Sequence, residues 1–156
     1  MGLDMYITAS GYTSASSVKR DPQQKEKYEA LLNVLQCENY ISNNLGFIEY
    51  EVEVAYWRKA NAIHGWFVQH CQDGVDNCEK HYVTRERMME LITLCKKVLN
   101  NPSLADELLP PHPGFFFGSY EIDDWYESSL KDTVQMLEHA LINVPDNMQF
   151  YYRSSW

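Results

Sequence analysis

The chain has 156 residues, of which 45% are hydrophobic and 22% are charged, and its formal net charge is −9. This composition excludes a wholly disordered chain, and the length predicts a single domain over 1–156 that can bury a core without disulfides. Because we find neither a run of roughly 20 apolar residues nor the charged and apolar regions of a signal peptide, we expect no membrane partner and a cytoplasmic location.

The first predicted element is a strand over 3–8, where apolar and polar residues alternate. Residues 9–20 are rich in serine, alanine and glycine, and this composition predicts a mobile loop. Asp21 and Pro22 then have the residue types of an N-cap and a first helical position. They predict a helix over about 22–37.

Residues 47–56 alternate between apolar side chains and glutamates, which is typical of a strand with one solvated face. A helix that starts near Glu51 is the alternative, because glutamate and alanine favour helices. The next helix is predicted over about 57–72 and ends at Asp73-Gly74, where glycine can adopt a left-handed conformation. The apolar face predicted for the strand holds Ile48, Tyr50, Val52, Val54 and Tyr56.

The clearest helical pattern covers about 85–100, where apolar residues recur every three or four positions after a threonine cap at Thr84. A long segment at about 101–120 follows. Its prolines and glycines predict irregular structure.

A last helix is predicted to begin at Ser128 or Ser129 and to end at Pro145, and the alternating tail over 148–156 predicts a strand beside the first one. The sequence therefore predicts the α+β class. We expect a small antiparallel sheet, built from the N-terminal strand, residues 47–56 and the C-terminal strand, covered by three to four helices.

Four cysteines occur without a signal peptide, so we expect reduced thiols and no cofactor. Cys37 and Cys95 fall on apolar helical faces and are predicted to be core residues. A zinc site is the alternative use of the other two cysteines, because the Cys-x-x-His spacing suits zinc; the simpler alternative is a buried thiol beside a polar loop. The zinc-ligand candidates are His70, Cys71, Cys78 and His81.

The densest group of unusual residues lies in the stretch Tyr-Trp-Arg-Lys-Ala-Asn-Ala-Ile-His-Gly-Trp-Phe-Val at 56–68. An indole could stack on a base, a cation could bind phosphate, and an asparagine and histidine three residues apart could contact one ligand. The simpler interpretation is a core helix whose asparagine and histidine satisfy backbone groups of a nearby loop. The ligand-binding candidates are Trp57, Arg58, Asn61, His64 and Trp66.

Asp4 lies in the otherwise apolar first strand, near the predicted last strand that carries Arg153. An ion pair between the two strands is the simple prediction. The alternative is a catalytic pair in which Asp4 assists His64 as the acid or base of a small hydrolase. We find no Walker A loop, dinucleotide fingerprint, nucleophile elbow or HExxH motif in the sequence.

Acidic residues concentrate in 101–156, which holds nine of them against two basic residues. This charge disfavours duplex nucleic acid as a partner, because such binding requires phosphate neutralisation, and it fits a basic protein surface. A solvated surface that maintains solubility is the simpler alternative. The protein-interaction candidates are Phe115, Phe116, Phe117, Tyr120, Asp123, Asp124, Trp125, Tyr126 and Glu127.

Three stretches together resemble a family of small bacteriophage and prophage proteins: Met-Gly-Leu-Asp-Met-Tyr at 1–6, the stretch at 56–68 quoted above, and Gly-Phe-Phe-Phe-Gly-Ser at 114–119 after Leu-Leu-Pro. The resemblance implies a gene product made in the cytoplasm of a bacterial host, and it brings no catalytic residue to transfer. By analogy of gene context, it implies a protein that binds and inhibits or modulates a host protein, antiviral defence systems included.

The leading hypothesis is therefore a non-enzymatic interaction protein whose partner is a bacterial host protein with a basic surface. A small-ligand binder, such as a nucleotide sponge, is the second hypothesis, and the small hydrolase is the third. Homo-oligomer formation stays open, because an exposed phenylalanine cluster favours self-association and a buried one does not.

Overall fold

The computed structural model describes residues 2–18, 21–39, 46–114 and 117–156. The strands are β1 (Asp4–Ser14), β2 (Phe47–Arg58), β3 (His81–Val83) and β4 (Gln149–Ser155). The helices are α1 (Ala15–Val18), α2 (Pro22–Leu35), α3 (Asn61–Cys71), α4 (Arg85–Asn100), the short 3-10 helix η1 (Pro102–Leu104), α5 (Ala105–Leu108) and α6 (Asp124–Asn143). The predicted α+β class with an antiparallel sheet is confirmed.

The chain groups into two compact units, where the sequence analysis expected one domain. The larger unit comprises Met1–Ala9 and Val52–Trp156, and the smaller unit comprises Ser10–Glu51. Strands β1 and β2 each contribute residues to both units.

In the smaller unit, the predicted start of α2 is confirmed. The carboxylate of Asp21 accepts a hydrogen bond from the backbone N–H of Gln23 at 3.0 Å, and proline follows the cap. Cys37, predicted as a core residue, is only half-buried there. Residues 40–45, between the predicted helix over about 22–37 and the predicted strand over 47–56, lie outside the described residues.

The mobile loop predicted at about 9–20 is wrong over residues 9–18. Strand β1 continues to Ser14 and α1 follows it. Strand β1 pairs with β2, and just beyond that pairing the N–H of Ala15, the first residue of α1, donates to the carbonyl of Gly46, the residue before β2, at 3.2 Å. Pairing with a neighbouring strand thus provides hydrogen-bond partners for backbone N–H and C=O groups of a stretch that composition alone assigned to a loop. Residues 19–20 lie outside the described part of the chain.

Residues 47–56 form a strand, so the helical alternative from Glu51 is wrong. The predicted apolar face is wrong in the second half of β2, where Ala55 and Trp57 are buried and Tyr56 is exposed. The reason is that the core of the larger unit lies on the face of Trp57, whose indole Nε1 donates to Thr133 Oγ1 of α6 at 2.9 Å.

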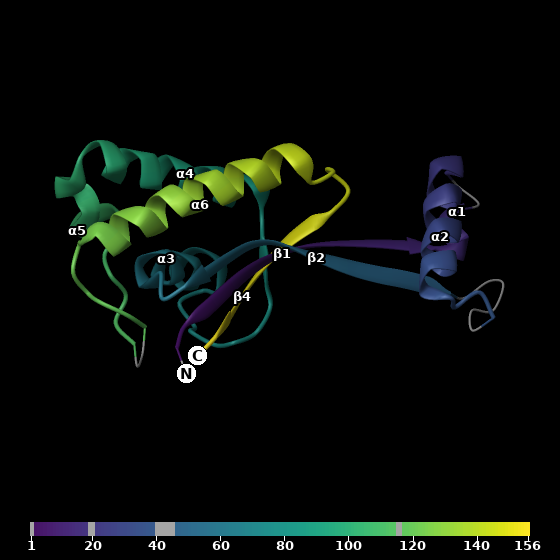
Figure 1. Ribbon diagram of the computed structural model, residues 1–156, viewed down its shortest axis with the longest axis horizontal. Helices are drawn as coiled ribbons and strands as arrows, with labels where there is room; N and C mark the ends of the chain where they lie inside the picture. The colour runs from purple at the N-terminus through teal and green to yellow at the C-terminus, as the bar shows by residue number, and fades with distance from the viewer. Residues whose placement is uncertain (1, 19–20, 40–45, 115–116) are drawn as a thin grey trace. The chain divides into compact units, whose positions relative to one another are not determined.

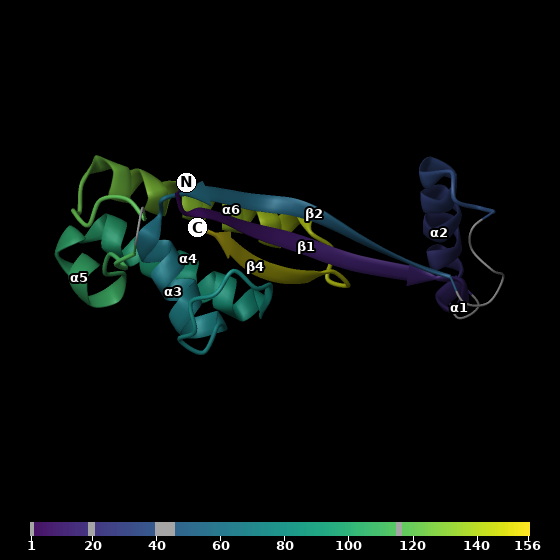
Figure 2. The ribbon, with the colours of Figure 1, turned by 90° about the horizontal axis from the view of Figure 1, so that it is seen from below.

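The strand order is β2-β1-β4-β3, so the predicted neighbourhood of the first and last strands is confirmed. Figures 1 and 2 show the start of β1 beside the end of β4. The sequence analysis predicts no strand at 81–83, but His81–Val83 form the short edge strand β3, which pairs antiparallel with β4 through His81 opposite Tyr152. Three residues are too few for a period-2 pattern to stand out.

Helices α4 and α6 lie side by side (Figures 1 and 2). The guanidinium of Arg85 at the start of α4 donates to the carbonyls of Leu141, Val144 and Pro145 at 3.2, 2.8 and 3.0 Å. These carbonyls lie at the end of α6, where a helix leaves acceptors without intrahelical donors. One side chain therefore joins the start of one helix to the end of the other.

Two helix starts differ from the prediction. Helix α3 begins at Asn61 instead of 57, because Trp57 still belongs to β2. Helix α6 begins four or five residues before the predicted serines, with Asp123 as the N-cap that accepts from the N–H of Tyr126 at 2.9 Å. In the predicted irregular segment, η1 and α5 form its first turns.

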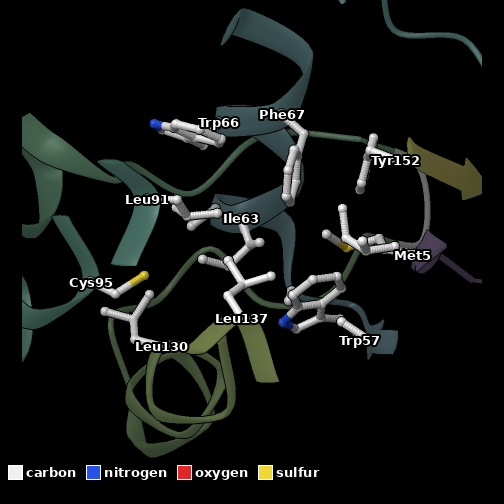
Figure 3. Packing of buried hydrophobic residues seen from close by; sticks show 14 of the residues in the cluster. Met5, Trp57, Ile63, Trp66, Phe67, Leu91, Cys95, Leu130, Leu137 and Tyr152 are labelled. Carbon is white, nitrogen blue, oxygen red and sulfur yellow. The ribbon is translucent and has the colours of Figure 1, made fainter. Parts of the chain in front are cut away.

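The core of the larger unit forms where α3, α4 and α6 meet the sheet. Ile63 of α3 lies between Leu91 of α4 and Leu137 of α6 (Figure 3), and all three are fully buried. Phe67 of α3 stacks on Tyr152 of β4 with ring centroids 4.1 Å apart. None of the helices in the described part of the chain is both long and apolar enough to span a bilayer.

The N-cap of α4 provides a test of the fold. Thr84 Oγ1 accepts from the N–H of Arg87 at 3.1 Å, so Thr84→Ala should lower the free energy of unfolding by about 1 kcal/mol in urea titrations. Thr93→Ala in the exposed middle of α4 is the matched control and should leave stability unchanged or slightly raised, because alanine is the better helix former. Equal losses in both variants would contradict the cap assignment.

Candidate functional site

The most unusual polar group of the larger unit is the imidazole of His64, which α3 holds with no exposed surface. Its Nδ1 lies 2.7 Å from Tyr152 Oη. Its Nε2 lies 3.1 Å from Asp76 Oδ1, a contact too poorly aligned for a well-formed hydrogen bond, and no other described residue gives it a hydrogen-bond partner. Burying a polar atom without a hydrogen bond costs about 1–3 kcal/mol, so this nitrogen is the feature of the site that most needs an explanation.

Asn61, one turn before His64, fixes the chain opposite α3. Its side-chain Nδ2 donates to the carbonyl of Ser119 at 2.7 Å and lies 3.5 Å from that of Phe117. Phe117 in turn packs edge-on against the imidazole, with ring centroids 5.1 Å apart. This is the simpler interpretation of Asn61 from the sequence, in which a core helix satisfies backbone groups of a neighbouring loop.

A second imidazole reaches the site because Gly65 has no side chain. A Cβ on Gly65 would lie 2.7 Å from the Cβ of His112, so any other residue would push His112 away. The rings of His112 and His64 are 5.6 Å apart, at 74° to each other. One donor atom each from His64, Asp76 and His112 lies within 4.8 Å of the other two.

Burial controls the charge state of the site. It lowers the pKa of His64 below the ordinary histidine value, and the nearby Asp76 carboxylate opposes that effect. Burial also raises the pKa of Tyr152 well above the ordinary tyrosine value. A neutral imidazole with a hydroxyl on one nitrogen and a carboxylate near the other can exchange a proton or bind a metal ion.

The ligand-binding candidates from the sequence do not share one cavity in the described structure. Trp57 and Trp66 are buried in the core, and the exposed Arg58 ends β2. Trp66 Nε1 has no hydrogen-bond partner among the described residues, and its ring stacks on His70 with centroids 4.8 Å apart. Trp66 and His112 both line a hollow of about 390 Å³ beside α3.

The two residues of the hydrolase hypothesis have other partners. Asp4 Oδ1 accepts a hydrogen bond from Tyr56 Oη at 2.6 Å, and His64 lies against Tyr152 and Asp76. The ion pair predicted between Asp4 and Arg153 is replaced by this bond, while the Arg153 guanidinium lies 5.4 Å from the ring centre of Tyr6.

The zinc-ligand candidates from the sequence do not cluster either. His70 stacks on Trp66, His81 Nε2 lies 2.8 Å from Asn77 Oδ1, and Cys78 is exposed. Within the described ranges, the only histidine, cysteine and carboxylate donors close enough to share an ion are those of His64, Asp76 and His112. Sequence reasoning missed Asp76 and His112, and the small residue after His64 was the available signal for a close approach.

The interaction candidates divide between core and surface. Phe117 and Tyr126 are buried, whereas Tyr120, Trp125 and the carboxylates of Asp124 and Glu127 are exposed. Phe117 and Tyr126, which the sequence analysis assigned to the interaction surface, are therefore core residues that hold this part of the chain in place. Phe115 and Phe116 lie outside the described residues.

We call residues 120–127 the acidic aromatic segment. It borders a hollow of about 150 Å³, whose lining includes Val98, Leu99 and Ile122. Asp123, Asp124 and Glu127 line the same hollow. This hollow thus has both apolar side chains and carboxylates in its lining.

No protein-family model, curated protein or solved structure matches this chain.

The four thiols should differ strongly in reactivity. Burial raises the pKa of Cys71 to about 11 and that of Cys95 to about 12, so at about pH 8 their thiolates are more than about a hundredfold rarer than that of an ordinary cysteine. Limiting iodoacetamide should therefore alkylate the exposed Cys78 first, as peptide mass spectrometry would show. Modification of Cys71 at the rate of Cys78 would contradict the described burial.

Proposed function

We propose that this protein is a non-enzymatic interaction protein that binds a basic surface of a partner protein through the acidic aromatic segment. The observation that carries the proposal is the exposure of large apolar side chains among carboxylates. Trp125 is 57% exposed, Tyr120 is 55% exposed and Ile122 is 43% exposed. Aromatic side chains of this kind dominate the binding energy of protein interfaces.

Buried contacts and hydrogen bonds hold the acidic aromatic segment in place, which supports a role in binding. Tyr126 is buried and its hydroxyl donates to the carbonyl of Leu109 at 2.9 Å. Asp123 caps α6, and Tyr120 Oη donates to the carbonyl of Gly114 at 3.1 Å. Side chains held in this way lose less conformational entropy when a partner binds.

The charge of the segment indicates the chemistry of the partner. Glu121, Asp124 and Glu127 are exposed, and Glu127 is the one that pairs with Lys131 at 2.5 Å. A lysine or arginine side chain fits such a place, because its stem can pack on apolar walls while its charge meets the carboxylates. Complementary charge also accelerates association and selects partners.

The biological setting of the proposal comes from the resemblance to small bacteriophage and prophage proteins. It supports a bacterial host protein as the partner and inhibition or modulation as the outcome, with an antiviral defence protein as one class of target. The resemblance and the acidic surface are independent of each other. Both favour an interaction with a protein over one with duplex nucleic acid.

The test compares partner capture from bacterial lysate by tagged wild-type protein and by surface variants. Trp125→Ala should weaken capture about 30-fold or more, the scale of an interface hot spot. The double variant Glu121→Lys and Asp124→Lys should abolish capture at low salt, because it neutralises the net negative charge of the segment without removing the Asp123 cap. Affinities of the captured protein are then measured by titration.

The matched control carries Glu26→Lys and Glu38→Lys, two exposed positions of the smaller unit that give the same change in net charge. This control should capture the partner as the wild type does. Capture that is equal in all variants, or lost equally in the control, would reject the acidic aromatic segment as the binding surface.

A further inference from the structure

The cluster of His64, Asp76 and His112 goes beyond the proposed function, since none of its residues belongs to the acidic aromatic segment. We infer that these three side chains form a binding site for a divalent transition-metal ion of the zinc class. Two imidazoles and one carboxylate are the donor types that such ions prefer.

The first argument is the poorly satisfied nitrogen. His64 is fully buried, and its Nε2 makes no well-aligned hydrogen bond among the described residues, although the Asp76 carboxylate oxygen lies 3.1 Å away. A metal ion bound to both atoms would replace this poorly aligned contact with two metal–ligand bonds.

The second argument is the support behind each ligand. Tyr152 Oη lies 2.7 Å from His64 Nδ1 and can accept a hydrogen bond from the Nδ1–H when Nε2 binds a metal. The indole Nε1 of Trp156 donates to Asp76 Oδ1 at 3.2 Å. Metal ligands in proteins usually have such outer partners, which orient the donor atom.

The third argument is the distance between the donors. They lie within 4.8 Å of one another, while ligands about 2.1 Å from a tetrahedral ion are roughly 3.4 Å apart. Closing the site therefore requires a shift of about an ångström. His112 can supply it because it lies in irregular backbone and is only half-buried.

The ion would have three protein ligands, which leaves one position for water or a small ligand. It would join α3 to the segments that carry Asp76 and His112, and His112 also lines the hollow of about 390 Å³ beside α3. Phe117 packs on both imidazoles, with centroids 5.1 Å from His64 and 6.3 Å from His112, and so forms an apolar wall of the site.

The experiment titrates metal-free protein with Zn²⁺ by calorimetry and follows the melting temperature in parallel. The wild type should bind one equivalent and melt at a higher temperature when loaded. Asp76→Asn, which keeps the size and an acceptor for Trp156, and His112→Gln should each weaken binding by more than about tenfold. Far-ultraviolet circular dichroism of both variants checks that they fold.

Matched controls make the same chemical changes elsewhere. Asp73→Asn in the same loop and His139→Gln on α6 should bind Zn²⁺ as the wild type does. Titration with Co²⁺ separates this site from one built on Cys71 and Cys78, because a thiolate ligand adds an intense near-ultraviolet charge-transfer band and imidazole does not.

Binding that is absent, or unchanged in Asp76→Asn and His112→Gln, would overturn the inference. A cobalt complex with a thiolate band would do so as well. Partner capture is measured in a buffer with a chelator, so a failure of the metal site and a failure of the proposed function give different results.

Discussion

The fold of the larger unit depends on accommodating one buried imidazole. His64 lies on the face of α3 that packs into the core, so its two nitrogens need partners from other parts of the chain. Tyr152 of β4 supplies one, and Asp76 after α3 lies against the other. Three segments therefore surround this side chain: the last strand, the loop after α3 and the segment that carries His112. An apolar residue could fill the same space without needing polar partners, so the presence of a histidine favours a functional role for the imidazole.

The surface and the buried cluster are connected through a few anchoring residues. Phe117 packs on His64, and Asn61 fastens the chain at Ser119, just before the acidic aromatic segment begins. Tyr126 and the Asp123 cap hold the other end of that segment on α6. The fold thus divides the acidic aromatic segment into buried anchoring residues and exposed side chains, a distinction that its composition alone does not give. The exposed ones are those available to a partner.

The sequence predicted best what depends on local signals. The bounds of α4 and the cap of α2 follow from an N-cap residue and a helical period, and both were confirmed. The continuation of β1 to Ser14 was missed because strand pairing outweighed a loop-like composition. The buried face of β2 was misjudged beyond Val54, because a period of two cannot tell which face the core covers.

The sequence indicated only part of the candidate site, because only part of it lies in an element with a local sequence signal. His64 stood out in the sequence as part of a dense group of unusual residues, three positions after Asn61, whereas Asp76 and His112 lie in irregular segments that carry no periodic signal. Their approach to His64 depends on Gly65, on the turn after α3 and on the anchoring of Phe117. These are tertiary constraints, which no local pattern encodes.

The most direct test of this account is the nitrogen-15 spectrum of the His64 ring, recorded by nuclear magnetic resonance with and without one equivalent of Zn²⁺. The account predicts that Zn²⁺ shifts the His64 Nε2 signal to that of a metal-bound nitrogen and places the proton on Nδ1, facing Tyr152. The same change should be absent in Asp76→Asn. An unchanged Nε2 signal in the wild type at full zinc occupancy would contradict the central role assigned to this imidazole.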